Sequence, residues 1–245
     1  MKKPVVSDDV IQSKTVENLV GSQVVDIVLY RFRKLIIKKG NDDIGISFNG
    51  SQSEVVSLYH YVVGNNYYVC QRLKEQEKEK RERKDKRKAH EIFSPKGSNL
   101  DINICLPEDF HGIINLLLCD GESEISVEHA NINLKAVTTN IIMDKTGPLE
   151  IESGDSNIMV KQASGKTHIL KAVNSTIKVE SGNINGLTME VESIDKGNSE
   201  IYLGKNLLIS GKVKINNING KIFQGDKLIN SVEEITKKTT RVRKK

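Results

Sequence analysis

Residues 153–183 read SGDSNIMVKQASGKTHILKAVNSTIKVESGN, and this stretch decides the fold. Two apolar pairs, Ile158/Val160 and Ile177/Val179, alternate with Ser-Gly pairs. Residues two positions apart point to the same face of a β-strand, so each pair predicts a short strand with one buried face. Glycine, serine and asparagine favour turns. The segments between the pairs are therefore predicted to be corners of a repeat and not ligand-binding loops.

The same pattern continues on both sides of this stretch. Apolar pairs begin every 7 to 11 residues in the first series, and a second series runs from Ile201 to Ile222. Two or three such units per coil would build a β-solenoid, in which apolar residues of successive coils stack. A β-sandwich of short hairpins is the alternative, because its turn signals recur at a similar spacing. The first series consists of Ile125/Val127, Ile132/Leu134, Ile141, Leu149/Ile151, Ile158/Val160, Ile169, Ile177/Val179 and Ile184.

Composition agrees with an all-β class. The 245 residues are 37% hydrophobic but only 4% aromatic, with no tryptophan. The core must therefore be filled by isoleucine, valine and leucine, and β-branched side chains suit strands better than helices. We predict an all-β chain: a single β-solenoid of short repeats, a less regular N-terminal β region, and a charged insertion that is helical or disordered.

The chain divides by these patterns into five segments. Strand-like runs begin at Val24, and Gly64-Asn65-Asn66 predicts a β-hairpin between two tyrosine- and valine-rich runs. The predicted segments are an N-terminal arm (1–20), N-terminal β-strands that continue into the solenoid (21–73), a charged insertion or linker (74–96), the repetitive β-solenoid (97–230) and a basic tail (231–245).

Positive charge is concentrated in two of these segments. The formal net charge is +5, yet residues 74–91 carry nine basic and six acidic residues, and residues 237–245 of the tail add six basic residues with no acid. The remaining chain is mildly acidic, which argues against a fold with a nucleic-acid-binding face. The candidate contacts for an anionic partner are the basic residues of the tail, namely Lys237, Lys238, Arg241, Arg243, Lys244 and Lys245.

No catalytic, cofactor-binding or metal-binding motif is found. Three cysteines without a CxxC pair predict neither a disulfide framework nor a zinc site, and the five histidines are scattered. Glu150 and Glu152 flank Ile151 and are predicted to face water while Ile151 faces the core. His168 is predicted to lie on a corner or an outward face. We therefore expect no cofactor and no enzymatic activity.

The sequence predicts a cytoplasmic protein without a transmembrane segment. The first residues, MKKPVVSDDV, place two aspartates before any apolar run could form, unlike a signal peptide. The longest apolar stretches, such as Ile113–Cys119, are far shorter than a membrane span.

A family resemblance follows from the order of these motifs. LDINICLPEDF (100–110), IINLLLCDGESEISV (113–127) and the ladder of I-x-V units up to Ile222 resemble the putative-adhesin β-solenoid domain family, a bacterial family of unknown function. Leu106-Pro107 and Gly121 match its strand ending in Leu-Pro and its glycine turn. The resemblance covers about 200 residues. It implies a β-solenoid that binds a protein or glycan partner. A weaker similarity links the chain to bactofilins, which polymerise.

Three functions remain open at this point. The first is a non-catalytic, adhesin-like interaction protein that presents outward residues such as Lys161, His168, Lys171 and Lys178. The second is a bactofilin-like scaffold that self-associates through the unpaired strands at the solenoid ends. The third is a polysaccharide-active β-helix enzyme that uses the carboxylates Glu150, Glu152 and Asp155.

Overall fold

The computed structural model describes residues 24–40, 44–72, 98–194, 197–231 and 235. Its strands form a single 14-stranded sheet with both parallel and antiparallel pairs. The one named helix in this part of the chain, α1 (Gln52–Val55), is a single turn. The predicted all-β class is therefore confirmed. The charged insertion and the basic tail fall outside the described residues.

Six short strands precede the regular part of the chain: β1 (Val24–Leu29), β2 (Lys34–Lys39), β3 (Gly45–Asn49), β4 (Leu58–Val63), β5 (Asn66–Gln71) and β6 (Asp101–Leu106). The others are β7 (Ile113–Val127), β8 (Asn131–Thr146), β9 (Leu149–Gly154), β10 (Asn157–Val173), β11 (Thr176–Glu192), β12 (Glu200–Ile218), β13 (Lys221–Gln224) and β14 (Lys227–Leu228). No helix among the described residues is long and apolar enough to cross a membrane.

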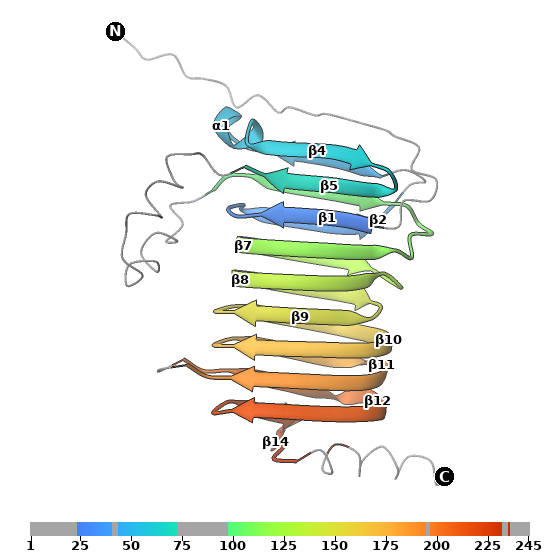
Figure 1. Cartoon of the computed structure of the whole chain (residues 1–245), viewed down its shortest axis with the longest axis vertical. Coiled ribbons are helices and arrows are strands. Elements are labelled where there is room, and N and C mark those ends of the chain that lie inside the picture. The colour runs from blue at the N-terminus through green and yellow to red at the C-terminus, as the bar shows by residue number, and fades with distance from the viewer. Residues whose placement is uncertain (1–23, 41–43, 73–97, 195–196, 232–234, 236–245) are drawn as a thin grey trace.

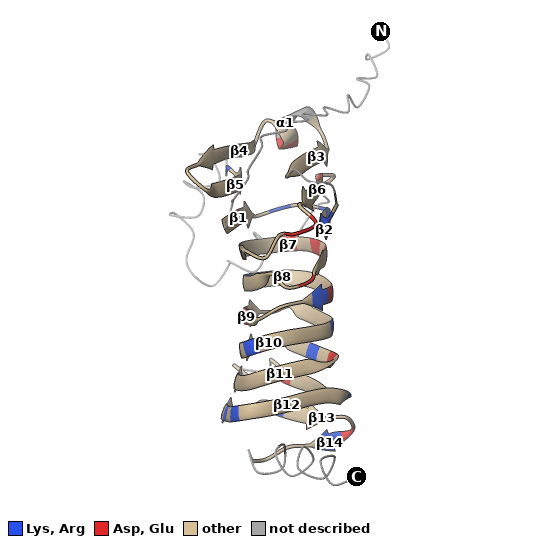
Figure 2. Cartoon of the chain, turned by 90° about the vertical axis from the view of Figure 1, so that its right-hand side faces the viewer, with Lys and Arg blue, Asp and Glu red and all other residues tan. Residues whose placement is uncertain are grey.

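The long strands take part in two ladders of parallel strands. In β7, residues 113–118 pair with β1, whereas residues 122–126 pair with β2. We call the ladder that contains β4, β5, β1, the first part of β7 and β9 the front ladder. The back ladder contains β3, β6, β2, the second part of β7 and β13. Figure 1 looks onto the front ladder, and Figure 2 shows the two ladders edge-on.

Residues that pair between neighbouring strands lie 17 to 19 positions apart from β7 to β11, and the interval widens to 24 to 26 positions between β11 and β12. Ile132 pairs with Leu149, Ile113 with Asn131 and Asn157 with Thr176. The predicted strand units recur at about half that interval, so each unit pairs with the second unit along the chain and not with the next one. The predicted stacking of Ile158/Val160 on Ile177/Val179 is confirmed.

The apolar core lies between the two ladders. The predicted I-x-V pairs face inward and are buried, for example Ile158 and Val160. One assignment is wrong: Ile169 points outward, while His168 and Leu170 are buried. Ile169 and Leu170 are both apolar, so the sequence alternation does not decide which one faces inward. The pairing decides it, because Leu170 aligns with the buried Ile151.

One corner of the chain repeats the same local geometry. Buried hydroxyl groups follow this corner and hydrogen-bond to the backbone of neighbouring strands. The amide of Thr139 donates to Ser156 Oγ, and the amide of Ser156 donates to Ser175 Oγ, both at 3.1 Å. Serine and threonine therefore satisfy backbone groups that the turn exposes. The corner residues with positive φ are Asp120 (51°), Thr138 (55°), Asp155 (48°) and Asn174 (47°).

The glycines of residues 153–183 serve backbone geometry, as predicted. Gly165 and Gly182 have φ values of +104° and +131°, a region that side-chain-bearing residues rarely adopt. A Cβ on Gly182 would lie 1.9 Å from the carbonyl oxygen of Ala163. Gly154 differs from these two, because the positive φ falls on Asp155, which follows it.

Antiparallel strands lie at both ends of the back ladder and at the N-terminal end of the front ladder. β4 pairs with β5 through the predicted hairpin at Gly64, whose φ is +60°. β3 pairs antiparallel with β6, and α1 connects β3 to β4 across the end of the core. At the other end, β14 pairs antiparallel with β13. Among the described strands, the front ladder ends opposite β4 with the second part of β12, which pairs in parallel with β11.

Candidate binding face

Outward side chains of the front ladder form straight columns because the parallel registers align them. One column runs from β4 across four neighbouring strands to β9. It changes from aromatic to polar along its length. We call it the polar column, and its members are Tyr61, Tyr68, Asp26, Asn115, Asn133 and Glu150.

Hydrogen bonds order the middle of the polar column. Asn115 Nδ2 donates to Asp26 Oδ1 at 2.6 Å, and Asn133 Nδ2 donates to Asn115 Oδ1 at 2.8 Å. Because each amide both donates and accepts, the chain of amides has one direction and ends on the Asp26 carboxylate. At the top of the column, the rings of Tyr61 and Tyr68 stack with centroids 5.0 Å apart.

The neighbouring column is apolar on β1 and β7 and charged on β8 and β9. Val28 and Leu117 lie beside Asp26 and Asn115, and Lys135 and Glu152 follow on β8 and β9. Lys135 Nζ lies 3.3 Å from Glu152 Oε2. This second column therefore places an apolar wall next to the amides of the polar column.

A shallow hollow of about 370 Å³ lies over these strands. Three carboxylates line it, against a single lysine that already contacts one of them. Its chemistry combines hydrogen-bonding groups, apolar side chains and excess negative charge. The side chains lining it include Asp26, Val28, Asn115, Leu117, Asn133, Lys135, Glu150 and Glu152.

The strands above the hollow carry no charged side chain. Burial, together with the charge of Asp26, raises the pKa of the Cys70 thiol. The pKa of Tyr61 is raised by Cys70 and by burial. Both groups are therefore neutral at physiological pH. β4 and β5 contain no Lys, Arg, Asp or Glu, so Asp26 on β1 is the first charge along the polar column.

Large apolar side chains are exposed on the same face. Tyr59, Tyr61 and Val63 of β4 are 45%, 48% and 60% exposed. Ile113 and Val137 continue this exposure on β7 and β8. A soluble surface rarely leaves several large apolar side chains close together without a role in binding.

The side chain of Gln71 fixes the position of β5 relative to the corner that follows β1. Its Oε1 accepts hydrogen bonds from the amides of Tyr30 and Arg31, both at 2.9 Å, and its Nε2 donates to the Arg31 carbonyl at 2.9 Å. The end of β5 is thereby joined to the corner between β1 and β2. Such backbone contacts give the face a defined shape before any partner arrives.

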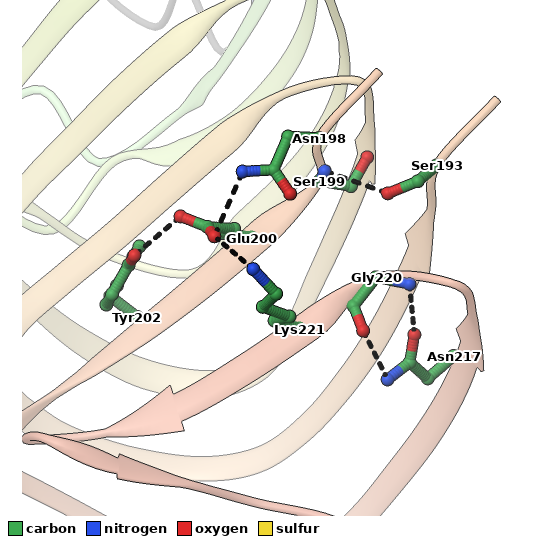
Figure 3. Close-up of polar contacts among 8 residues, drawn as sticks. All are labelled: Ser193, Asn198, Ser199, Glu200, Tyr202, Asn217, Gly220 and Lys221. Atoms are coloured by element: carbon green, nitrogen blue, oxygen red, sulfur yellow. Dashed lines mark hydrogen bonds and ion pairs between the residues drawn. The ribbon is translucent and has the colours of Figure 1, made fainter. Parts of the chain in front are cut away.

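A second hollow of about 710 Å³ lies on the back ladder near β12 and β13. The rings of Tyr202 and Phe223 stack there with centroids 4.7 Å apart. Glu200 accepts hydrogen bonds from Tyr202, Asn198 and Lys221, and these contacts, with Tyr202 first, lower the pKa of its carboxyl group. Figure 3 shows these polar groups already paired with one another. The front hollow is therefore the stronger candidate site.

The structure tests several predictions about individual residues. Glu150 and Glu152 are exposed and Ile151 is buried, as predicted. The prediction for His168 is wrong, because this side chain is 2% exposed and lies between Leu149 and Leu187 in the core. The six basic residues of the tail lie outside the described residues, so their role stays a prediction.

Asparagine has two roles in the described residues. Asn174 adopts a positive φ at a corner. Side-chain amides also form ladders between strands, because Asn157 Nδ2 donates to Asn140 Oδ1 at 3.3 Å, in addition to the hydrogen bond from Asn133 to Asn115. Asn131 has an ordinary backbone conformation at the start of β8.

Sequence reasoning missed the tyrosines of β4 and β5 as site residues. The signal was the alternation in SLYHYVVGNNYYVC (57–70), which was used only to predict the hairpin. The alternation shows that Tyr59 and Tyr61 share a face, but only the pairing with β5 and β1 brings that face next to Asp26 and Asn115.

No family model and no curated protein matches the chain. Among solved structures, a putative adhesin from Bacteroides fragilis is similar at 14% identity, with 89% of this chain and 98% of that chain covered and a TM-score of 0.46. A putative cell adhesion protein from Clostridium sporogenes is 13% identical, with 89% and 100% covered and a TM-score of 0.32.

A third similar structure is a putative lipid binding protein from Parabacteroides distasonis, at 10% identity, with 86% and 96% of the two chains covered and a TM-score of 0.34. Proteins called putative adhesins thus occur among the structural neighbours, as the family resemblance implies. These identities and TM-scores are too low to carry an argument about what this chain binds.

Proposed function

We propose that the chain is a β-solenoid that binds a protein partner and catalyses no reaction. The solenoid is supported by the pairing interval of 17 to 19 residues from β7 to β11, because a nearly constant interval between paired strands is what successive coils produce. It is also supported by the corner that recurs at Asp120, Thr138, Asp155 and Asn174. A solenoid of this kind offers long exposed faces on a rigid support.

The observation that carries the binding proposal is the hollow on the front ladder. It sets the carboxylates of Asp26 and Glu150 beside the apolar side chains of Val28 and Leu117. A partner that fills it must cover apolar surface and also supply positive charge and hydrogen-bond donors. A protein segment with an apolar side chain next to lysine or arginine meets these needs. Binding of this adhesin-like type requires no catalytic group.

A phage-displayed random peptide library on the immobilised full chain tests this proposal. We expect the selected peptides to carry Lys or Arg next to an apolar residue. Their binding should weaken at least about tenfold for the double variant Asp26→Asn/Glu150→Gln, through lost charge and hydrogen bonds. Binding should also weaken with rising salt.

The matched control is Glu190→Gln. Glu190 lies lower on the same face, where it pairs with Lys171 at 3.4 Å and does not line the hollow. This variant should bind the selected peptides as the wild type does. Peptides that bind all variants equally would contradict the proposal. A glycan array that yields ligands, where the peptide library yields none, would shift it to a carbohydrate partner.

The two other candidate functions have narrower support. A polysaccharide-active enzyme is favoured only by the carboxylates of Asp26, Glu150 and Glu152 around one hollow, and turnover of an oligosaccharide that Glu150→Gln abolishes would establish it. A bactofilin-like polymer needs parallel coils to continue between molecules. The antiparallel strands β4 and β14 weigh against such end-to-end stacking.

A further inference from the structure

We infer that the front hollow binds an extended protein segment that crosses β1, β7, β8 and β9 and carries basic residues at positions i and i+4. This inference rests on the proposed function and adds the conformation, the course and the charge spacing of the bound segment. The hollow runs across these strands, because residues 26–28, 115–117 and 133–135 line it together with Glu150 and Glu152. Figure 1 shows the four strands one below another.

The hollow is a groove between the polar column and the second column. The backbone of Ile27, Leu116 and Leu134 forms its floor, since these residues lie between the two columns and their side chains are buried. Neighbouring outward side chains of one strand lie about 7 Å apart. A helix with its side chains is about 10 Å wide, which is too broad for such a groove. An extended segment is narrow enough to lie between the columns.

Two carboxylates at opposite ends of the groove set the charge spacing. Within the described part of the chain, Asp26 and Glu150 have no ion pair, whereas Glu152 already contacts Lys135 at 3.3 Å. Asp26 and Glu150 are three strand steps apart, which is about 14 Å. Four residues of an extended chain span about the same distance, and side chains at i and i+4 point to the same side. Two basic residues at this spacing therefore reach both carboxylates.

The Asp26 end of the groove favours a basic side chain over a neutral hydrogen-bond donor. Tyr68 lies beside Asp26 on the polar column. The rings of Tyr61 and Tyr68 have centroids 5.0 Å apart and planes at 13°, so they overlap face to face. Tyr61 therefore covers one face of Tyr68, and the other face is turned toward Asp26. A cation at this place would contact a carboxylate and an aromatic face together.

The second column predicts where the segment carries its apolar residue. Successive side chains of an extended chain point to opposite sides, so the neighbour of the residue at Asp26 faces the second column. There Val28 and Leu117 supply apolar surface, whereas the members of this column on β8 and β9 are charged. The residue at i+2 faces Asn115 and Asn133, where a polar side chain can form hydrogen bonds. The expected order is basic, apolar, polar, polar, basic.

Fluorescence anisotropy with synthetic peptides and the full chain tests the spacing. The reference peptide contains lysine, valine, two serines and lysine in that order, between flanks of glycine and serine. Its isomers have the same composition, but their second lysine stands at i+2 or i+8. We expect the reference peptide to bind at least about threefold more tightly than either isomer, because only its spacing brings both lysines to a carboxylate in an extended chain.

Double-mutant cycles assign each lysine to one carboxylate. Glutamine replaces either lysine of the reference peptide, and each peptide is measured with the wild type, Asp26→Asn and Glu150→Gln. Each protein variant should weaken the reference peptide about threefold. Asp26→Asn should couple only to the lysine beside the valine, and Glu150→Gln only to the other lysine. The coupling is local because the separation of about 14 Å exceeds the Debye length at physiological salt.

The matched control is again Glu190→Gln, which removes a charge from the same face outside the hollow. It should leave the affinity for the reference peptide unchanged. Asp26→Asn keeps an oxygen that can accept the hydrogen bond from Asn115 Nδ2, and Glu150 is exposed. Circular dichroism and thermal unfolding of both variants should therefore match the wild type.

Equal affinities for the reference peptide and its isomers would overturn the inference. If Asp26→Asn/Glu150→Gln still weakened all of these peptides, the hollow would remain a peptide-binding site and only the extended i, i+4 arrangement would fail. Coupling of both lysines to the same carboxylate would also overturn the arrangement, because the segment would then not cross the strands. Peptide binding that neither carboxylate affects would overturn this inference and the proposed function together.

Discussion

Residues 131–192 and residues 45–71 belong to the same sheet, but their strands are covered differently. In residues 131–192, each strand has a parallel neighbour on both sides, and the outward side chains of the front ladder include Lys135, Glu150 and Glu152. In residues 45–71, the strands β3 and β4 pair on one side only among the described strands, and β4 carries exposed tyrosines.

The difference between the two regions shows at which positions stacking of the strands restricts the choice of amino acid. A repeat fixes its inward residues and its corners, because every coil must stack on the next. Its outward residues follow the usual preference for charge and polarity at a surface. The N-terminal end departs from that preference where its outward side chains turn aromatic. We therefore place the proposed partner-binding hollow directly below that end.

The largest expected effect is a loss of stability, and its size should differ between the two regions because their packing differs. Ile151 is fully buried between Leu134 and Leu170, so Ile151→Ala should lower the free energy of unfolding by about 2–5 kcal/mol through the lost side chain and the cavity left behind. Val62 of β4 is only partly buried, and Val62→Ala should cost about 1 kcal/mol.

Urea unfolding measures both variants, and Glu152→Ala serves as the control. Glu152 is exposed beside Ile151, so its removal should change the free energy of unfolding by no more than about 0.5 kcal/mol. Equal losses for Ile151→Ala and Val62→Ala would mean that the N-terminal end is packed as tightly as the ladder. The comparison between the two regions would then fail.

The next effect concerns His168, a polar side chain within the core of the regular ladder. Its Nε2 has no hydrogen-bond partner among the described residues. Burial lowers the pKa of His168, and backbone hydrogen bonds with Gly165 and Ser164 offset part of this change. The folded protein therefore keeps the imidazole neutral at a pH where the unfolded chain would protonate it.

This lowered pKa sets the direction of the pH dependence. Below about pH 6.5 the unfolded chain binds a proton that the folded chain does not, so stability falls as the pH decreases. His168→Leu should remove this dependence. It should also raise the free energy of unfolding at pH 7 by about 1–2 kcal/mol, because no unsatisfied polar atom remains buried. Urea unfolding at pH 5.5, 6.5 and 7.5 measures both effects. A variant with an unchanged pH profile would assign the dependence to another group.

The regular ladder was largely predictable, for a physical reason. Alternating apolar residues and turn-forming residues report inward faces and corners directly, as Ile158/Val160 and Gly182 illustrate. The prediction for His168 failed because a single histidine next to two apolar residues reads equally well as surface or core. Only its alignment with Leu187 and with Leu149 places it inside.

The candidate site was far less predictable. Asp26 meets Asn115 and Asn133 only because β1 pairs with β7, at a sequence separation of 89 between Asp26 and Asn115, and the sequence carries no signal of that distant register. Glu150 and Glu152 were assigned correctly to the surface, yet their part in a hollow depends on the same pairing.

The smallest expected effect separates the two regions by their response to acid. Glu54 of α1 joins the N-terminal end to the segment that leads into β6. Its carboxylate accepts hydrogen bonds from the Ser51 amide at 3.0 Å and the Ser51 hydroxyl at 2.6 Å. It also accepts one from the Ser98 hydroxyl at 2.9 Å and one from the Asn99 amide at 3.0 Å. The bond from the Ser51 amide to Glu54 is one half of a capping box.

Burial alone would raise the pKa of Glu54, but the hydrogen bonds from Ser51, Asn99 and Ser98 outweigh it and leave the pKa below its usual value. The contribution of these bonds is present above about pH 4.5 and is lost as the pH falls through the lowered pKa. The N-terminal end should therefore keep its protection from hydrogen exchange through the range in which His168 weakens the ladder. It should open only at more acidic pH.

Hydrogen exchange measured by mass spectrometry resolves the two regions. Peptides over residues 50–63 should exchange faster in Glu54→Gln than in the wild type at neutral pH, whereas peptides over residues 149–163 should not change. The glutamine keeps the size of the side chain but loses the charge that strengthens these bonds. Faster exchange in both regions would show that α1 and the ladder open together, and the N-terminal end would then be an integral part of the repeat's cooperative unit.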